Sequence, residues 1–367
     1  MDDFLIIGGG IAGVSAGARL AGLGSVTLLE AEPALGYHAS GRSAALYEPR
    51  YGSSSTVALS LASGDFYLDT AREMLTPRGL MMVASADEQA TFEADCDGME
   101  MTRISPEEAC AIMPILKPEM VTHAAKHDEA WDIDTDRLIQ RFARELRSNG
   151  RIVTSAQAVA IRRLPKGWEV DAGGETYSAR NLVNAAGAWV DEIAAMAGIA
   201  PIGITPLRRS MARIEVPGGL DASTWPMCFG PGESWYAKPD AGALIVSPAD
   251  QDPVAPQDAW ADDMVLAEGI FRFSEYITEE VTRMIANWAG LRSFAPDHNL
   301  VIGAAPSDPG YFWFAGQGGY GFQTAPAASA LLADIVAGRP GVIDAESRAM
   351  LDPARFNQGD GGGPGSA

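Results

Sequence analysis

The chain has 367 residues, of which 47% are hydrophobic and 20% charged, so it is long enough for two domains that fold together. Its formal net charge of −21 at pH 7 disfavours nucleic acid and anionic lipid as partners, because so acidic a surface repels both. No apolar run reaches the roughly 20 residues that a membrane-spanning helix needs, so we expect no transmembrane span.

The N-terminal segment predicts a strand–turn–helix–strand unit. The apolar run at residues 4–7 is typical of a buried strand, and the glycine-rich segment 8–13 ends it. A helix with small residues on one face is predicted for residues 11–23, followed by a second buried strand at 26–29 that ends at Glu30. This order implies a parallel sheet.

The rest of the chain predicts a mixture of helices and strands. Residues 33–51 form a loop rich in Gly, Ser and Ala, in which a helix could begin at Arg42. Further helices are expected at residues 59–74, 87–97, 105–112, 135–149 and 325–336 and within 260–284. Strands are expected at residues 81–84, 152–159, 168–171, 176–178, 181–184, 210–217, 234–238, 243–247, 301–303 and 311–315. The glycine-rich segment 358–367 is expected to be disordered.

Cysteine and histidine are scarce, and their spacing predicts no metal site. The three cysteines form no CxxC pair: Cys96, Cys110 and Cys228. His123 and His127 lie four residues apart, but the charged Lys126 and Asp128 beside them predict an exposed turn. Since no basic segment precedes the first strand, we expect no signal peptide and a reducing, cytoplasmic location.

The segment Gly8-Gly9-Gly10-Ile11-Ala12-Gly13 fits the pattern GxGxxG between a strand and a helix, which predicts a dinucleotide site. Gly8 permits the tight turn, Gly10 lets the backbone approach a pyrophosphate, and Gly13 allows close helix–strand packing. Glu30 would accept hydrogen bonds from ribose hydroxyls. The predicted contacts in this unit are Gly8, Gly10, Ala12, Gly13, Glu30 and Ala31. The unit alone leaves FAD and NAD open, but its place at the extreme N-terminus favours FAD.

Four further segments occur in an order and spacing that indicate a family. They are Gly36-Tyr37-His38-Ala39-Ser40-Gly41-Arg42-Ser43-Ala44-Ala45, Asn184-Ala185-Ala186-Gly187-Ala188-Trp189, Trp288-Ala289-Gly290-Leu291-Arg292-Ser293-Phe294 and Gly316-Gln317-Gly318-Gly319-Tyr320-Gly321-Phe322-Gln323-Thr324. Together they resemble the D-amino acid oxidase family of flavoenzymes, and within it the D-arginine dehydrogenases of bacteria, from about residue 4 to about residue 336.

The resemblance implies an α/β fold in which a Rossmann-like FAD-binding domain with a parallel sheet is interleaved with a mostly antiparallel substrate domain. We expect the FAD-binding domain to comprise residues 1–75, 148–205 and 290–350, and the substrate domain 76–147 and 206–289. Residues 353–367 are expected to form a disordered tail. FAD should be noncovalent, because no cysteine follows Cys228 to attach it near the C-terminus.

The resemblance also implies which further residues contact the cofactor. The loop residues around the flavin and its pyrophosphate are Ala39, Ser40, Gly41, Arg42, Ser43, Ala44, Ala45 and Leu46, and those at the adenine are Ala158 and Val159. A glycine turn then brings a helix N-terminus to the flavin C2 carbonyl through Gly318, Gly319, Tyr320, Gly321, Phe322 and Gln323. The dipole of that helix would stabilise negative charge on the reduced flavin, although the turn could also serve only as a helix cap.

The substrate implied is a small amino acid whose carboxylate is held by Arg209 and Arg292, because arginine binds carboxylates bidentately. Either arginine could instead form a structural ion pair, as expected for Arg208. Tyr51, Tyr236 and Gln323 are predicted to position the substrate. Hydride passes from the amine carbon to the flavin in this family, and no side chain is required as a base. The imino acid product would hydrolyse to a 2-oxo acid and ammonia.

Several pocket positions depart from the D-arginine dehydrogenases. Leu80 replaces a glutamate that pairs with a guanidinium, and Leu46 replaces a histidine. Other residues predicted to line the pocket are Met227, Phe229, Gly319 and Phe322. These changes predict a more apolar substrate side chain. Glu48 could restore cation binding if it points inward, but a solvated outward charge is expected.

Three other functions remain open. The first is a sarcosine- or glycine-type amine oxidase of the same superfamily, and the second is a flavin-binding accessory subunit of a larger assembly. The third is a nicotinamide-dependent dehydrogenase. The electron acceptor also stays open among oxygen, a quinone and another protein.

Overall fold

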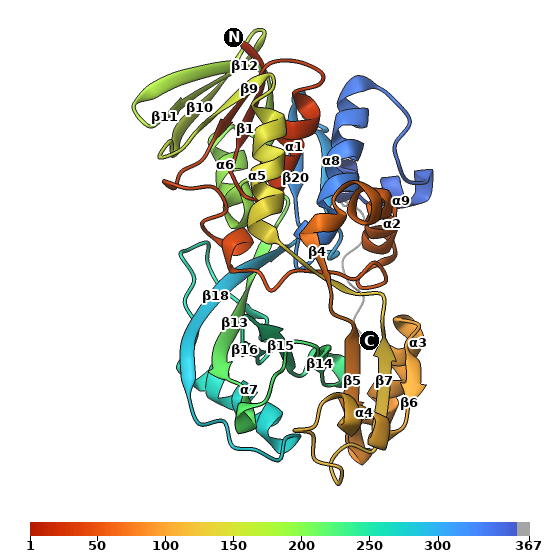
Figure 1. Cartoon of the computed structure of the whole chain (residues 1–367). Helices are drawn as coiled ribbons and strands as arrows, with labels where there is room; N and C mark the ends of the chain where they lie inside the picture. The colour runs from red at the N-terminus through yellow and green to blue at the C-terminus, as the bar shows by residue number, and fades with distance from the viewer. Residues whose placement is uncertain (358–367) are drawn as a thin grey trace, which may run out of the picture.

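The computed structural model describes residues 1–357, so the predicted disorder of residues 358–367 lies outside the described residues. Two large sheets form the frame. Figure 1 shows the first at the top of the view, with helices α1, α5 and α8 beside it, and the second at the bottom, beside α3, α4 and α7. The expected fold, with a parallel-containing sheet and a second, mostly antiparallel one, is confirmed.

The first sheet has the order β10-β11-β12-β1-β2-β9, with β20 beside β12 and β19 beside β20. The pairs β1–β2, β1–β12, β2–β9 and β12–β20 are parallel, while the hairpins β10–β11, β11–β12 and β19–β20 are antiparallel. Its strands are β1 (Asp2–Ile7), β2 (Val26–Leu29), β9 (Gly150–Val153), β10 (Ala158–Leu164), β11 (Gly167–Ala172), β12 (Glu175–Asn184), β19 (Val301–Ala305) and β20 (Asp308–Ala315).

The second sheet has the order β17-β13-β16-β15-β14-β5-β7-β6, with β18 beside β13. Every pairing in it is antiparallel except β5–β14. Its strands are β5 (Leu80–Ala84), β6 (Thr102–Ile104), β7 (His123–His127), β13 (Thr205–Glu215), β14 (Met227–Phe229), β15 (Tyr236–Asp240), β16 (Ala243–Ser247), β17 (Asp252–Pro253) and β18 (Met284–Phe294). A small third sheet joins β3 (Leu46–Tyr47), β8 (Trp131–Ile133) and β4 (Leu75–Pro77).

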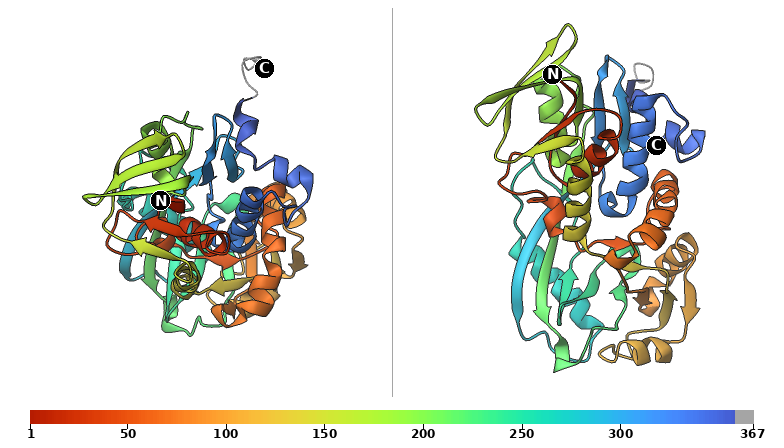
Figure 2. Two further views of the ribbon diagram at one scale, coloured as in Figure 1. Left: turned by 90° about the horizontal axis from the view of Figure 1, so that it is seen from above. Right: turned by 45° about the horizontal axis from the view of Figure 1, so that its top comes forward.

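The α-helices are α1 (Ile11–Leu20), α2 (Ser54–Ala62), α3 (Gln89–Gly98), α4 (Pro106–Ile112), α5 (Thr135–Leu146), α6 (Val190–Met196), α7 (Asp263–Glu275), α8 (Gly321–Ala337) and α9 (Ala345–Ala349). Short helical turns include η1 (Ala39–Arg42), the π-helical η2 (Phe66–Thr70), η3 (Arg72–Met74), η4 (Ala86–Glu88), η5 (Gly187–Trp189), η6 (Pro217–Gly219), η7 (Pro231–Glu233) and η8 (Pro353–Asn357). Figure 2 shows the C-terminal helices beside α2, although the two segments are far apart in sequence.

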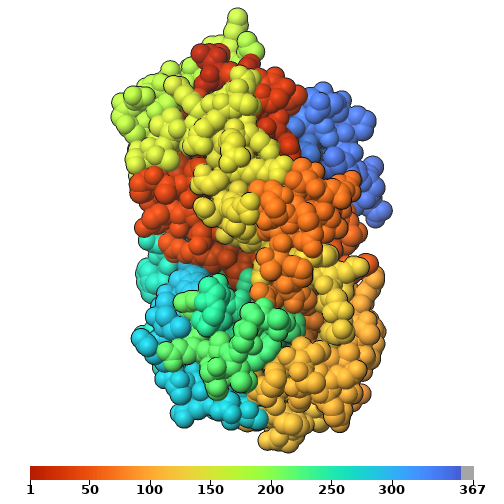
Figure 3. Space-filling model, viewed as in Figure 1, coloured from red at the N-terminus to blue at the C-terminus, as the bar shows by residue number. Residues whose placement is uncertain are grey.

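Segments from the N-terminal part of the chain lie between the two sheets. In the space-filling view of Figure 3, the red-orange and orange parts of the chain cross the middle of the molecule, between the upper and lower parts. The loop after β2 therefore lies between the two sheets. The first sheet contains β1, which leads into the glycine fingerprint, and the second sheet carries Arg209 and Arg292.

Several predicted elements were wrong in extent. No helix begins at Arg42, because its guanidinium is held by Ala259, Ala289 and Asp258 and the chain becomes extended at Ser43. The helix predicted at 59–74 begins earlier, at Ser54, where the Ser53 side chain caps it, and is interrupted after Ala62, while the helical turns η2 and η3 cover residues 66–70 and 72–74.

The strand pattern also differs at three places. The strand predicted at 152–159 is split into β9 and β10, because Ser155 has φ +54° and its backbone turns to pair with the loop after β2. Residues 176–178 and 181–184 form one strand, β12. The exposed turn predicted around His123 and His127 is strand β7, which pairs with β5 and β6.

The predicted tail begins too early. Residues 353–357 form η8, and Arg355 makes an ion pair of 2.7 Å with Asp297 while Leu351 is buried. The domain boundaries stay a prediction. Strand β18 crosses the boundary expected at residue 290, and helix α5, assigned to the substrate domain, shares a hydrophobic core with α1. Within residues 1–357, none of the helices combines the length and apolar character needed to cross a bilayer.

Candidate active site

The glycine fingerprint brings helix α1 against strand β1. Gly8 has φ +109°, and a Cβ atom there would lie 2.4 Å from the carbonyl oxygen of Ala185. A Cβ on Gly13 would lie 1.8 Å from the carbonyl oxygen of Gly8. Helix α1 begins at Ile11 with a glycine as its N-cap residue and no acidic residue in its first turn, and the backbone N–H of Ile11 donates to the Ser40 hydroxyl at 3.0 Å. Its N-terminus is therefore suited to an anionic group such as a pyrophosphate.

Glu30, directly after β2, contacts the glycine fingerprint. The side chain is buried, and its oxygens accept hydrogen bonds from the backbone N–H of Gly9 at 2.5 Å and of Glu32 at 2.8 Å. Burial raises the pKa of Glu30, while the two backbone hydrogen bonds oppose that rise. Because each carboxylate oxygen can accept more than one hydrogen bond, Glu30 can still serve as a ribose acceptor.

A single cavity of about 1210 Å³ extends from the fingerprint to the second sheet. This volume exceeds the roughly 300–1,000 Å³ of ordinary small-ligand pockets, so it has room for a dinucleotide and a small substrate together. Of the predicted cofactor residues, those that line it are Gly8, Gly10, Ala12, Glu30, Ala31, Ala39, Ser40, Arg42, Ser43, Ala44, Ala45, Leu46, Ala158, Gly318, Gly319, Gly321, Phe322 and Gln323.

Four predicted cofactor residues lie outside the lining. Gly13 packs on Gly8, and Gly41 packs on Gly36, where a Cβ would lie 2.4 Å from a carbonyl oxygen. Val159 is 66% exposed, while its neighbour Ala158 lines the cavity. Tyr320 precedes α8 and packs against Tyr51, with ring centroids 5.2 Å apart.

Arg209 and Arg292 are brought together by the pairing of β13 with β18. Arg209 lies opposite Gly290, so Arg292 is its diagonal neighbour on the same face of the sheet. Both line the cavity. Arg209 is only 2% exposed, and its Nε donates to the backbone oxygen of Asp250 at 3.0 Å. Its Nη2 is buried and has no hydrogen-bond partner among residues 1–357.

Arg292 lies directly against the glycine turn. A Cβ on Gly319 would lie 2.6 Å from Nη2 of Arg292, so only glycine leaves room for the guanidinium. Burial lowers the pKa of Arg292, but Tyr51 and Glu233 together with neighbouring tyrosines outweigh that effect, and the net shift is upward. Arg292 is therefore a permanent cation facing the cavity.

Glu233 is a site residue that the sequence analysis missed. Its Oε2 lies 3.5 Å from Nη1 of Arg209 and 3.8 Å from Nη1 of Arg292, and its Oε1 accepts a hydrogen bond from the Tyr51 hydroxyl. Burial raises the pKa of Tyr51, so the phenol remains a donor. The signal available in the sequence was a carboxylate in the short loop between Phe229 and Tyr236, two predicted site residues.

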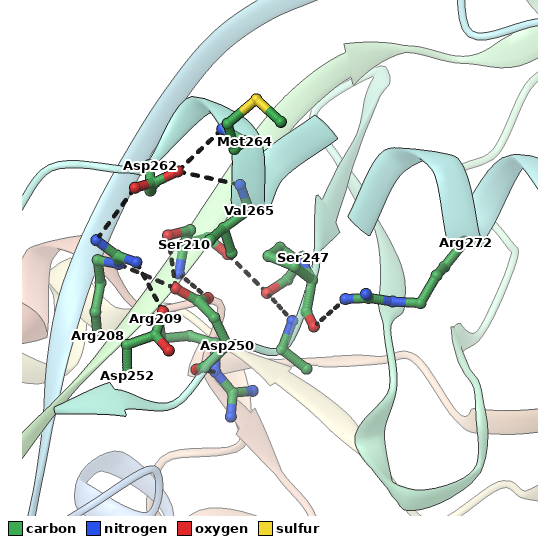
Figure 4. Close-up of polar contacts among 12 residues, drawn as sticks. Arg208, Arg209, Ser210, Ser247, Asp250, Asp252, Asp262, Met264, Val265 and Arg272 are labelled. Atoms are coloured by element: carbon green, nitrogen blue, oxygen red, sulfur yellow. Dashed lines mark hydrogen bonds and ion pairs between the residues drawn. The ribbon is translucent and has the colours of Figure 1, made fainter. Parts of the chain in front are cut away.

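Arg208 lies outside this cluster, as predicted. It forms ion pairs with three carboxylates, Asp250 at 3.3 Å, Asp252 at 2.7 Å and Asp262 at 3.9 Å (Figure 4). Asp250 also accepts hydrogen bonds from the backbone N–H and the hydroxyl of Ser210 (Figure 4). Two adjacent arginines thus have different environments, because neighbouring residues of a strand point to opposite faces.

Helix α8 begins at Gly321, four residues before its predicted start, and carries no side-chain cap. Its N-terminal turn lines the cavity. Gln323 is buried, and its side-chain amide donates to the backbone oxygen of Tyr51 and to the Ser60 hydroxyl, each at 3.1 Å. Gln323 therefore fixes the segment that carries Tyr51.

The expectation of a solvated Glu48 was wrong. Its side chain is buried, and the residue lines the cavity. One oxygen accepts from the backbone N–H of Arg50 at 3.0 Å, and the other lies 3.0 Å from Nδ1 of His127. His127 reaches it because β7 places this residue opposite Leu80 on β5. Burial raises the pKa of the Glu48 carboxyl, although both hydrogen bonds oppose the rise.

The remaining pocket positions are apolar, as predicted. Leu80, Phe229 and Tyr236 are buried in one core cluster, against which Leu46 and Met227 pack. Phe322 is also buried and lines the cavity. None of the three cysteines belongs to the lining.

Comparison with known proteins identifies what this arrangement resembles. The family described as "FAD dependent oxidoreductase" (DAO) matches residues 3–335. Glycine oxidase of Geobacillus kaustophilus (strain HTA426) is 24% identical over 359 residues, covering 91% of this chain and 92% of that protein. FAD-dependent oxidoreductase domain-containing protein 1 of Bos taurus is 24% identical over 395 residues, covering 91% and 81%. Among solved structures, L-proline dehydrogenase from P. horikoshii aligns with a TM-score of 0.82 at 22% identity, covering 97% and 98% of the two chains.

Proposed function

Because the chain belongs to the DAO family of FAD-dependent oxidoreductases, we propose that it oxidises the amine carbon of a small α-amino acid with an apolar side chain. The observation that carries this proposal is a pair of guanidiniums in the cofactor cavity, a buried one on Arg209 and a partly buried one on Arg292, that share the single carboxylate of Glu233. One positive charge is left over there, and the carboxylate of an amino acid would complement it.

The cavity residues fit FAD. The glycine cradle leaves no space for a Cβ at Gly8 or Gly13, the α1 N-terminus has no acidic residue in its first turn and suits the phosphates, and Glu30 suits a ribose. When bound, FAD accepts the hydride that leaves the amine carbon. The uncapped N-terminus of α8 supports the same assignment, because its dipole would favour negative charge in that part of the cavity.

The chain's own contribution is orientation. Arg292 and Arg209 would hold the substrate carboxylate. Tyr51, whose raised pKa keeps the phenol protonated, donates its hydroxyl hydrogen to Glu233 and so holds that carboxylate beside the two arginines. Gln323 holds the backbone of Tyr51 in place. We assign no general base. The imine would be released and hydrolysed to a 2-oxo acid and ammonia.

The apolar wall around the substrate region supports preference for an apolar side chain. Leu80, Phe229 and Leu46 offer no charge to a substrate cation, and Glu48, although it lines the cavity, already bonds His127 and the Arg50 backbone. Burying an unpaired guanidinium against such a wall would be costly. We therefore propose apolar D-amino acids ahead of D-arginine, with the D configuration resting on the resemblance noted in the sequence.

The second candidate is oxidation of glycine or sarcosine. The likeness to a glycine oxidase over more than nine-tenths of both chains favours it, and the same arginines would serve its carboxylate. An accessory role without catalysis is less well supported, because both arginines are present and line the cavity. The electron acceptor stays open among oxygen, a quinone and another protein.

The test is anaerobic reduction of the bound flavin by a panel of D- and L-amino acids, glycine and sarcosine, followed by the loss of flavin absorbance. We expect apolar D-amino acids to bleach the flavin fastest. Bleaching fastest by glycine or sarcosine would select the second candidate. Bleaching fastest by D-arginine would show that Leu80 does not determine specificity, and a flavoprotein reduced by none of them would refute the proposal.

A further inference from the structure

The two guanidiniums of the proposed carboxylate site share a single carboxylate, which lies at unequal distances from them. Within residues 1–357, Glu233 is the only carboxylate in ion-pair range of either Arg209 or Arg292. Its Oε2 is divided between them at 3.5 and 3.8 Å, whereas a charge-assisted hydrogen bond is about 2.7–2.9 Å long. In addition, Nη2 of the buried Arg209 has no hydrogen-bond partner in the part of the chain that the structure describes. The cluster therefore has room for one further carboxylate.

The position of Glu233 depends on a costly loop conformation. Glu233 has φ +53° and Gly232 φ +63°, and a non-glycine residue in this region of conformational space is strained. Ser234 Oγ and Trp235 Nε1 are buried without hydrogen-bond partners among the described residues. Such costs are sustained only when surrounding contacts compensate for them.

The compensating contacts converge on the Glu233 carboxylate and its loop. The backbone N–H of Gly232 donates to Asp95 on α3 at 2.7 Å, and the Tyr51 hydroxyl donates to Oε1 of Glu233. The two arginines supply the opposite charge. Glu233 is thus held at the arginine pair from three directions, and it also lines the cavity.

From this charge balance we propose that Glu233 is a specificity-determining residue that restricts the site to substrates with one carboxylate. Two guanidiniums without Glu233 would complement a dicarboxylate, whereas with Glu233 they complement a single carboxylate. A second substrate carboxylate would meet the like charge of Glu233 beside the two arginines, which disfavours its binding. The inference rests on the proposed function, because it takes these arginines as the carboxylate site.

The test compares Glu233→Gln, which keeps an acceptor for Tyr51 but removes the charge, with Glu233→Ala, which also removes the bulk. Glu100→Gln is the matched control, because Glu100 is an exposed carboxylate paired with Arg50, another residue of the cavity lining. The FAD-loaded proteins are titrated with acetate and with malonate or succinate, and binding is read from the perturbation of flavin absorbance. Flavin reduction by D-alanine and by D-aspartate is measured alongside.

In the native protein we expect dicarboxylates to bind no better than acetate. In Glu233→Gln, the preference for dicarboxylate over acetate should rise on the order of 10- to 100-fold, because the like charge next to the arginines is gone. The preference for D-aspartate over D-alanine should rise in parallel. Glu100→Gln should show neither change. Unchanged preferences in both Glu233 variants, or an equal loss of binding of both ligands, would overturn the proposal.

The two readouts separate this inference from the proposed function. A shift in dicarboxylate binding without flavin reduction by any amino acid would support the role of Glu233 and refute amino acid oxidation. Flavin reduction by apolar amino acids without a shift in dicarboxylate binding would keep the proposed function and refute the role of Glu233. If Glu233→Ala does not fold, Glu233→Gln alone decides, because it preserves size and hydrogen bonding.

Discussion

Replacing Gly13 by alanine should disrupt both the fold and cofactor binding, whereas Gly10→Ala should disrupt cofactor binding alone. A Cβ on Gly13 would lie 1.8 Å from the carbonyl oxygen of Gly8 and 2.9 Å from its carbonyl carbon, both of them backbone atoms. Ordinary van der Waals contact begins near 3.4 Å, so helix α1 would have to move away from β1 by more than an ångström.

The magnitude follows from two opposing effects. Alanine within a helix is favoured over glycine by about 1 kcal/mol. Overpacking a rigid site costs typically 1–3 kcal/mol, and a backbone contact this short belongs at the upper end or beyond. The net loss of stability for Gly13→Ala is therefore about 2 kcal/mol or more, which lowers the folding equilibrium constant by roughly 30-fold.

At Gly10 the fold should tolerate a methyl group. Its Cβ would meet only the hydroxyl of Ser40, at 3.0 Å, which accepts a hydrogen bond from the Ile11 backbone N–H and would have to shift by only a few tenths of an ångström. Gly10 has φ −74°, which any residue adopts, and it lines the cavity. The methyl group would therefore occupy the place where the backbone approaches the pyrophosphate.

The assay is the flavin-to-protein ratio after saturation with FAD, together with the denaturant midpoint of each apoprotein. Gly10→Ala should keep the native midpoint and lose flavin, while Gly13→Ala should lose both. A Gly10→Ala protein that retains full flavin would refute the placement of the phosphates at this turn. A Gly13→Ala protein with native stability would refute the close contact of α1 with β1.

Two further substitutions test the substrate side of the cavity. Arg292→Ala should lower kcat/KM for the amino acid by about 30-fold or more with flavin content unchanged, because removing one partner of a buried charge pair costs roughly 2–5 kcal/mol. Arg208→Lys is the control and should keep near-native kinetics, because its ion pairs lie outside the cluster. Unchanged kinetics in Arg292→Ala would remove that residue from the site. Glu48→Gln should stabilise the protein increasingly as pH rises above 4.5. Burial raises the pKa of Glu48 in the folded state above its ordinary value of 4.5. The contribution of Glu48 to native stability is therefore fully present below pH 4.5 and is lost as pH rises through the folded pKa. Thermal unfolding of both proteins from pH 4.5 to 8 measures this, and a constant difference in Tm would contradict it.

Local sequence patterns predicted the cofactor part of the protein well. The strand, glycine turn and helix around Gly8 are set by neighbouring residues, and strands β1 and β2 lie within one residue or two of their predicted bounds. The wrong predictions concern segments whose structure depends on distant partners. His127 lies in a strand because β5 and β6 pair with β7, and Arg42 stays out of a helix because residues more than two hundred positions away hold its guanidinium.

The sequence by itself determined the dinucleotide turn, the apolar pocket residues and the two arginines as candidates, because each has a local motif or a family position that identifies it. Only the tertiary structure decided which charges meet. Arg209 and Arg292 become neighbours through the pairing of β13 with β18, and Glu233 reaches both from a loop that carries no recognisable motif. Buried charges must find partners wherever the chain folds them, and that pairing has no counterpart in sequence spacing.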